Sequence, residues 1–269
     1  MALNISPDTG NYLIGKGIVL FQPAGAADFF HVGNVPSLAI TPKTTLLDHF
    51  SSMAGTKTKD LTLVTEKTMD MKMQMEEFTA RNLAMIMLGD IDNTDPDAPI
   101  VNLFTQASTT GHLKFYATND VGPRWFIDLP SVTINPSGDL NVISDGFGNM
   151  EVTGSVNSVG GIWGTATLQA PAGTVAPENV LEPTITGESP PDVSAATVQT
   201  ANIGGWIGAS SFTYAWKAAG TGAAGVPSNQ RTYIPAAGDV GKTLTVTVTA
   251  VNTTGSTAVT SDPTVAVIT

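Results

Sequence analysis

Alternating apolar and polar residues predict that most of this chain is β-structure. The sharpest pattern covers residues 69–75, where four methionines alternate with polar side chains. Successive side chains of a strand point to opposite faces, so the methionines share one face. Such a stripe could form a soft binding surface or a metal site, but a buried strand face is its ordinary meaning. Apolar residues predict further strands at 18–21 and 61–65.

Short strand patterns also alternate with turn signals along the middle of the chain. We predict strands at 112–117, 124–129, 131–134, 150–156 and 162–168. Clusters of Gly, Pro, Asn and Asp separate them, as turns between strands require. This regular spacing is typical of an antiparallel sandwich or barrel.

One helix interrupts the strands. Thr79 is predicted as its N-cap, and Gly89 is predicted to end it in a left-handed conformation. Phe78, Met85 and Leu88 fall on one helical face. We expect that face to pack against the sheet.

The last part of the chain is predicted to be all strand. Threonines alternate there with Leu244, Val246, Val248 and Ala250, which is the pattern of a half-buried strand. A second strand surrounds Trp216, and we expect that side chain to anchor the core together with the valines.

A proline-rich stretch divides the 269 residues into two parts. Five of the 17 prolines fall between Pro171 and Pro191, and proline suits a linker better than a central strand. The sequence therefore predicts an all-β chain with one flanking helix. Its predicted parts are a first domain over 1–172, a linker over 173–182 and a separate β-sandwich over 183–269.

Charge and cysteine content narrow the function. The chain has 12 basic and 23 acidic residues, a net charge of −11, and no cysteine. A disulfide scaffold is thereby excluded, and tight DNA binding, which rests on Lys and Arg, is disfavoured. The start of the chain lacks a secretory signal pattern, and no apolar run approaches the ~20 residues of a membrane span. We expect a product made in a cytoplasm without membrane insertion.

No chemical motif survives closer reading. Residues 236–243 resemble a phosphate-binding loop, but an alternating strand follows where that loop needs a helix. The three histidines, at 31, 49 and 112, lie in no ligand spacing. We predict no catalytic residue, no metal ligand and no cofactor, and therefore no enzyme. A hydrolase acting through carboxylates is a remaining alternative.

An acidic segment after the helix could hold calcium. Its carboxylates are Asp90, Asp92, Asp95 and Asp97. The glycine and the last glutamate of an EF-hand loop are replaced there by Asp95 and Val101. A solvated loop is the favoured interpretation, and calcium binding stays open.

Ordered motifs over residues 10–170 resemble the major tail tube protein of long-tailed bacteriophages. The motifs are Gly15–Phe21, Val32–Pro36, Leu47–Ser52, Gly55–Asp60, Glu77–Gly89, Leu129–Pro136 and Glu151–Gly154. The second part resembles a bacterial-type immunoglobulin-like domain. Its motifs are Tyr214-Ala215-Trp216 and Tyr233 to Lys242, with Trp216, Leu244, Val246 and Val248 as expected core.

The first resemblance implies a structural virion protein. Tail tube proteins fold as a β-sandwich or barrel with a flanking helix, form hexameric rings and stack into a hollow tube. The implied partners are other copies of the chain, other tail proteins and DNA passing through to the host. Assembly would occur in the host cytoplasm. A loop over Pro42–Asp60 is expected to bridge rings through Leu46, Leu47, Asp48, His49 and Phe50.

Charge suggests how such a tube would treat DNA. Residues 1–172 hold 9 basic and 17 acidic residues, a net charge of −8. A negative bore would repel phosphate and would not hold the DNA. Glu66, Asp70 and Glu76 are the candidate lumen-facing acids, although Lys72 shares the face of Asp70.

The immunoglobulin-like part is expected outside the tube, as a decoration with weak contacts to a host surface. An alternative function for the whole chain is a β-domain surface adhesin or carbohydrate-binding protein.

Overall fold

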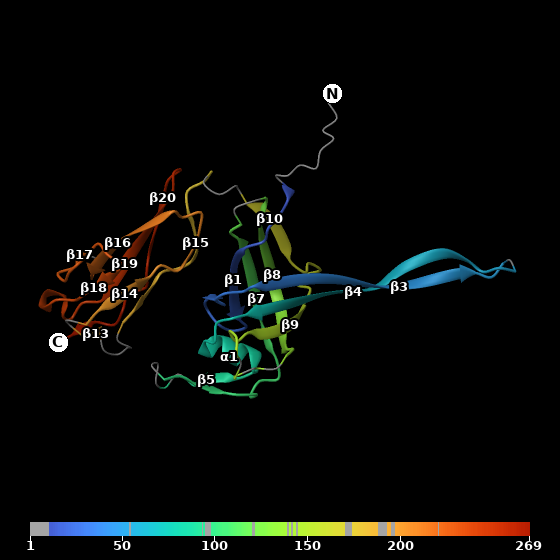
Figure 1. Cartoon of the computed structure of the whole chain (residues 1–269), viewed down its shortest axis with the longest axis horizontal. Helices are drawn as coiled ribbons and strands as arrows, with labels where there is room; N and C mark the ends of the chain where they lie inside the picture. The colour runs from blue at the N-terminus through green and yellow to red at the C-terminus, as the bar shows by residue number, and fades with distance from the viewer. Residues whose placement is uncertain are drawn as a thin grey trace, which may run out of the picture.

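The computed structural model confirms an all-β fold with one short helix among its described residues (Figure 1). These residues are 11–53, 55–92, 94, 98–119, 122–138, 140, 142–143, 145–169, 174–187, 193–194, 197–219 and 221–269. Within these ranges, no helix has both the length and the apolar character needed to cross a membrane.

An antiparallel sheet organises the first part of the chain. Its strands are β1 (Gly17–Pro23), β2 (Phe30–His31), β3 (Ser37–Ser51), β4 (Thr58–Met75), β7 (Thr109–Ala117), β8 (Arg124–Pro136), β9 (Met150–Val156) and β10 (Thr165–Gln169). The strand order is β2-β1-β7-β8-β9-β4-β3, and β10 pairs with the first half of β8. A small hairpin-like pair, β5 (Asp90–Asp92) and β6 (Ile100–Asn102), lies beside helix α1 (Ala80–Ile86).

The predicted strands 124–129 and 131–134 are one strand, β8, despite Pro130. Against β7, the pairing shifts between Gly111 and Leu113, so that Pro130 lies in a bulge. On the other side, β10 pairs with 124–128 and β9 with 132–136. Pro130 falls between these two partners, where its missing N–H costs no ladder hydrogen bond.

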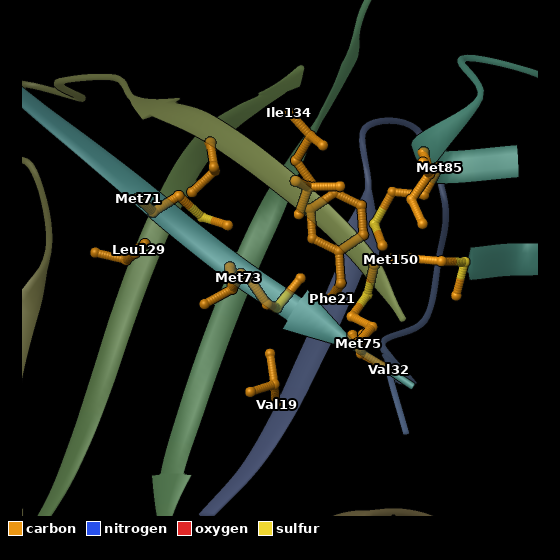
Figure 2. Packing of buried hydrophobic residues seen from close by; sticks show 14 of the residues in the cluster. Val19, Phe21, Val32, Met71, Met73, Met75, Met85, Leu129, Ile134 and Met150 are labelled. Carbon is orange, nitrogen blue, oxygen red and sulfur yellow. The ribbon is translucent and has the colours of Figure 1, made fainter. Parts of the chain in front are cut away.

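The methionine stripe lies in the main core. Met71, Met73 and Met75 are buried and Met69 is partly buried, as the strand-face interpretation predicts. Figure 2 shows the side chains of Met71, Met73 and Met75 meeting others from β1, β8, β9 and the helix. The flexible methionine side chains fill the space between the sheet and α1. Buried residues packed with them include Val19, Phe21, Val32, Met85, Leu113, Leu129, Ile134, Met150 and Val152.

Helix α1 begins as predicted and ends differently. The Thr79 hydroxyl accepts a hydrogen bond from the Asn82 amide at 3.1 Å. At the other end Leu88, with φ of 48°, takes the left-handed conformation predicted for Gly89. Gly89 is needed for another reason, because a Cβ there would lie 2.4 Å from the Asn102 carbonyl oxygen. Of the face predicted to pack, Met85 and Leu88 are buried, whereas Phe78 is exposed.

Strands β3 and β4 form a long hairpin that extends away from the body of the sheet (Figure 1). The predicted irregular loop over Pro42–Asp60 is therefore wrong. Strand β3 runs to Ser51, and β4 starts at Thr58. Side chains on both faces of the outer hairpin are exposed, so neither face needed the period-two apolar pattern that usually reveals a strand.

The second part of the chain is built from smaller sheets. Its strands are β11 (Glu178–Leu181), β12 (Thr184–Thr186), β13 (Val193–Ser194), β14 (Gln199–Asn202), β15 (Gly205–Ile207), β16 (Ser211–Ala218), β17 (Thr221–Gly222), β18 (Thr232–Tyr233), β19 (Leu244–Val251), β20 (Ser256–Thr260) and β21 (Val267–Ile268). They pair as β17-β16-β19-β20, β12-β14-β18, β11-β15 and, in parallel, β13-β21. Residues 178–181, predicted as linker, thus form a strand paired with β15.

Aromatic stacking anchors the second core. Trp216, Leu244, Val246 and Val248, the expected core residues, are all buried. The Trp216 ring stacks on Tyr233 with 5.1 Å between centroids. Its indole N–H donates to the Gln230 carbonyl at 2.8 Å, so the buried ring keeps a polar partner.

The stretch that mimics a phosphate-binding loop is a structural corner. A short 3-10 helix, Ala237–Asp239, precedes β19. The buried Asp239 carboxylate accepts hydrogen bonds from the Tyr233 hydroxyl and from the backbone amides of Ala224, Gly225 and Ala236. The Asp239 carboxylate is therefore hydrogen-bonded within the fold, and the stretch has a structural role.

Candidate assembly surface

The outer half of the β3–β4 hairpin exposes an unusual number of large apolar side chains. We call residues 46–64 the outer arm. Six of its described side chains are between 48% and 58% exposed: Leu46, Leu47, Phe50, Leu61, Leu63 and Val64. Where such exposed apolar side chains form a contiguous patch, they are typical of an interaction site. A two-stranded hairpin is also marginally stable alone in water, so a partner surface would stabilise it.

Strand register divides these side chains between two faces. Leu47 lies opposite Leu63, and His49 opposite Leu61. Paired residues share a face, so Leu47, Leu61 and Leu63 form one continuous leucine face. On the opposite face, a polar cluster around Asp48 separates the Leu46–Val64 pair from Phe50. The leucine face is therefore the more continuous apolar surface.

One ion pair and one histidine–carboxylate contact fasten the strands of the outer arm. The Lys59 ammonium lies 2.7 Å from the Asp48 carboxylate, which also accepts the Thr62 hydroxyl at 2.8 Å. These hydrogen bonds, from Lys59 first and then Thr62, hold the pKa of Asp48 below its ordinary value. His49 Nδ1 lies 2.6 Å from Asp60. Asp48 and His49, predicted as contacts between rings, thus bond within the arm.

The outer arm also carries free strand edges. Among the described strands, β3 has β4 as its neighbour and lies at the end of the sheet order. Strand β9 pairs with β4 from Met69 to Met75, so the described partner of residues 58–68 is β3 alone. Unpaired N–H and C=O groups along both edges could bind a strand of another chain.

A groove of about 680 Å³ lies at the helix end of the sheet. It is lined by the β1–β2 turn, α1, Ile91 of β5 and the start of β7. The lining is mostly apolar and carries three charged residues, Asp28, Arg81 and Asp90. The Arg81 guanidinium lies over the Phe30 ring, 5.6 Å from its centroid. No local sequence pattern indicates this groove, because it joins segments more than 80 residues apart.

Asp90 holds part of the groove wall in place. Its carboxylate accepts hydrogen bonds from the Thr105 hydroxyl at 2.7 Å and from the side-chain amide of Gln106. These bonds lower the pKa of Asp90 from its ordinary value, Thr105 being the larger cause. The carboxylate therefore stays charged at neutral pH and adds negative charge to the rim.

The candidate lumen acids each have a local partner. Asp70 lies 2.6 Å from the Lys43 ammonium, and Glu66 accepts from the Thr45 hydroxyl at 3.2 Å. Glu76 accepts from the side-chain amide of Asn34. Strand alternation puts Glu66 and Asp70 on the β4 face opposite the methionines. Whether this face lines a bore stays a prediction.

The other sequence candidates are not brought together. Within the described ranges, no three His, Asp or Glu side chains gather as a metal site would need. Asp92 accepts from Thr94, while Asp95 and Asp97 lie outside the described residues. His112 bonds Asp128 on the neighbouring strand.

His31 has a local structural role. Its Nδ1 accepts the Gly33 amide at 2.8 Å, and burial lowers the pKa of its imidazole despite the nearby Glu77. His31, the last residue of β2, thus accepts a hydrogen bond from the segment that leads to β3.

Comparison with known proteins finds a match to a family whose function is unknown. A family described as "Protein of unknown function UCP028589" matches residues 12–99. This range includes the outer arm, α1 and most of the groove lining. No curated protein matches the chain.

Proposed function

We propose that this chain is the structural subunit of a phage tail tube, forming stacked rings, six chains to a ring, around an open bore. The outer arm is the observation that carries this proposal. Its exposed apolar residues and free strand edges are suited to contacts between copies of one chain. The ordered resemblance to tail tube proteins over residues 10–170 supports the same conclusion.

The proposed task of the tube is to pass DNA without binding it. Six copies at −11 each would give a ring a formal charge of −66, of which the tube-forming residues 1–172, at −8 each, supply −48. Negative walls repel phosphate and offer few Lys or Arg side chains for counterion release. Glu66 and Asp70 extend from β4 on the face opposite the core, which suits them for lining a bore.

The second part is proposed to decorate the outside of the tube and to make weak contacts with a host surface. Its core is closed around Trp216 and Tyr233, so it does not need the first sheet to bury its aromatic residues. The outer face of β16 and β19 carries threonines and few charges, including Thr213, Thr245, Thr247 and Thr249. Such a face favours weak polar contacts.

Electron microscopy of a truncated chain tests this division of labour. Strand β11 belongs to the second part, so the cut falls before residue 174 and removes residues 174–269. We expect the shortened chain to form tubes with the bore and ring spacing of the full chain but a smaller outer diameter. Tubes of unchanged outer diameter would contradict external decoration. Failure to form tubes, when the full chain forms them, would show that the second part is needed for assembly.

A further inference from the structure

We propose that the leucine face of one subunit's outer arm docks in the groove beside α1 of a second copy of this chain. This inference rests on the proposed function, in that it names the two surfaces through which the subunits would join end to end. The resemblance to tail tube proteins implies no role for this groove.

Shape and polarity fit the two surfaces. A groove of about 680 Å³ lies within the ~300–1,000 Å³ range of protein binding pockets and can take several side chains. Apolar residues of its lining include Pro23, Ala26, Phe30, Met85 and Ile91. The leucine face offers three neighbouring side chains that are each at least half exposed. Burying both apolar surfaces together would stabilise the contact.

Charge also favours the arm as the occupant. Residues 43–67 hold four basic and three acidic residues, a net charge of +1. The rest of the chain then holds 8 basic and 20 acidic residues, a net charge of −12. Asp28 and Asp90 outnumber Arg81 in the groove lining. The outer arm itself is neutral, with two basic and two acidic residues, and its flanking Lys43 and Lys67 make the wider hairpin slightly cationic. The acidic body of another copy therefore does not repel it.

The arrangement within one chain makes the contact intermolecular. The hairpin extends away from the body that carries α1 and β5 (Figure 1). Arm and groove are different patches, so a subunit that docks its arm still offers an empty groove to the next one. Such a heterologous contact does not saturate after two copies, and it builds an open-ended polymer when the rotation between successive copies does not close a ring. The polymer therefore has a direction, with arms free at one end and grooves free at the other.

Matched single substitutions test each surface. Leu63→Asp on the leucine face and Ile91→Asp in the groove should each raise the critical concentration for polymerisation about 100-fold or more, since a charge would be buried in an apolar contact. Val64→Asp is the control for the arm, since Val64 is adjacent and faces the other way. Ile100→Asp is the control for the groove, since Ile100 is 60% exposed and does not line it. Both controls should polymerise like the original chain.

Mixing the two defective variants distinguishes this contact from others. Leu63→Asp keeps a working groove and Ile91→Asp keeps a working arm, so each can supply one half of a contact. Sedimentation velocity first gives the mass of the unit that each variant forms alone, whether that unit is a single chain or a ring. After equal mixing, the mass of this unit should double and should grow no further. Normal polymerisation of Ile91→Asp, failure of Val64→Asp, or absence of doubling would each overturn the inference.

The original chain, run in parallel, separates this inference from the proposed function. If the original chain and Ile91→Asp both form tubes, the proposed role of the groove is wrong and the proposed tube function is supported. If the original chain forms linear polymers without a bore and the variants behave as expected, the docking of the arm in the groove is supported and the tube function is wrong. If it stays monomeric at all concentrations, both fail.

Discussion

Replacing residues 46–65 by an Asn-Gly turn is expected to leave a folded chain that no longer polymerises. Thr45 and Glu66 lie opposite each other in the hairpin, so a two-residue turn can join them. The change removes the three side chains of the leucine face, which are each at least half exposed. Burying the exposed half of each would contribute about 1 kcal/mol per side chain, or ~3 kcal/mol in all. We therefore expect the critical concentration to rise about 100-fold or more.

Circular dichroism and sedimentation together check this expectation. The main core lies away from the outer arm, so the melting temperature should change little. The variant should sediment as a small unit at concentrations where the original chain forms long polymers. Polymers of normal length from the shortened hairpin would rule out the outer arm as an assembly element.

Asp239→Ala is expected to destabilise the second part of the chain by about 3–5 kcal/mol, because it leaves buried donors without an acceptor. The affected donors are the Tyr233 hydroxyl and three backbone amides. Urea unfolding followed by the fluorescence of Trp216 and Trp206 measures the loss. Asp262→Ala, at an exposed position, is the matched control and should change stability by less than ~0.5 kcal/mol.

The same carboxylate gives the second part a pH dependence. Burial raises the pKa of Asp239, but the hydrogen bonds from Tyr233 and the backbone amides outweigh it and hold the pKa below 3.8. Its stabilising contribution is therefore present above pH 3.8 and is lost as pH falls through the lowered pKa. Acid should weaken the second part in this window, and Asp239→Ala should remove this component of the acid sensitivity. An unchanged acid profile in the variant would show that Asp239 does not govern it.

Much of the fold was predictable because one face of most strands is buried. The methionines of β4 and the residues around Trp216 follow period two, since each second side chain must leave water. The Thr79 cap is a local interaction and was therefore also predictable. Pro130 misled the prediction of β8, because a bulge and a gap between two neighbouring strands depend on pairing that local sequence does not specify.

The candidate site was only partly predictable. Leu46, Leu47 and Phe50 were found because apolar residues in a long polar stretch need an explanation. Their hairpin was missed, because an arm exposed on both faces has no buried face to set a period. Leu61 and Leu63 join the leucine face through cross-strand register. The groove depends on bringing the β1–β2 turn to α1 and β5, which is a property of the tertiary fold.

We propose that the outer arm joins copies of this chain into a tube. A helical reconstruction by electron cryo-microscopy of the assembled full chain tests it most directly. We expect stacked six-fold rings around an open, electrically negative bore, with each outer arm crossing to the next ring and ending in the groove beside α1. Monomers at high concentration, or rings whose arms make no contact with the next ring, would contradict it.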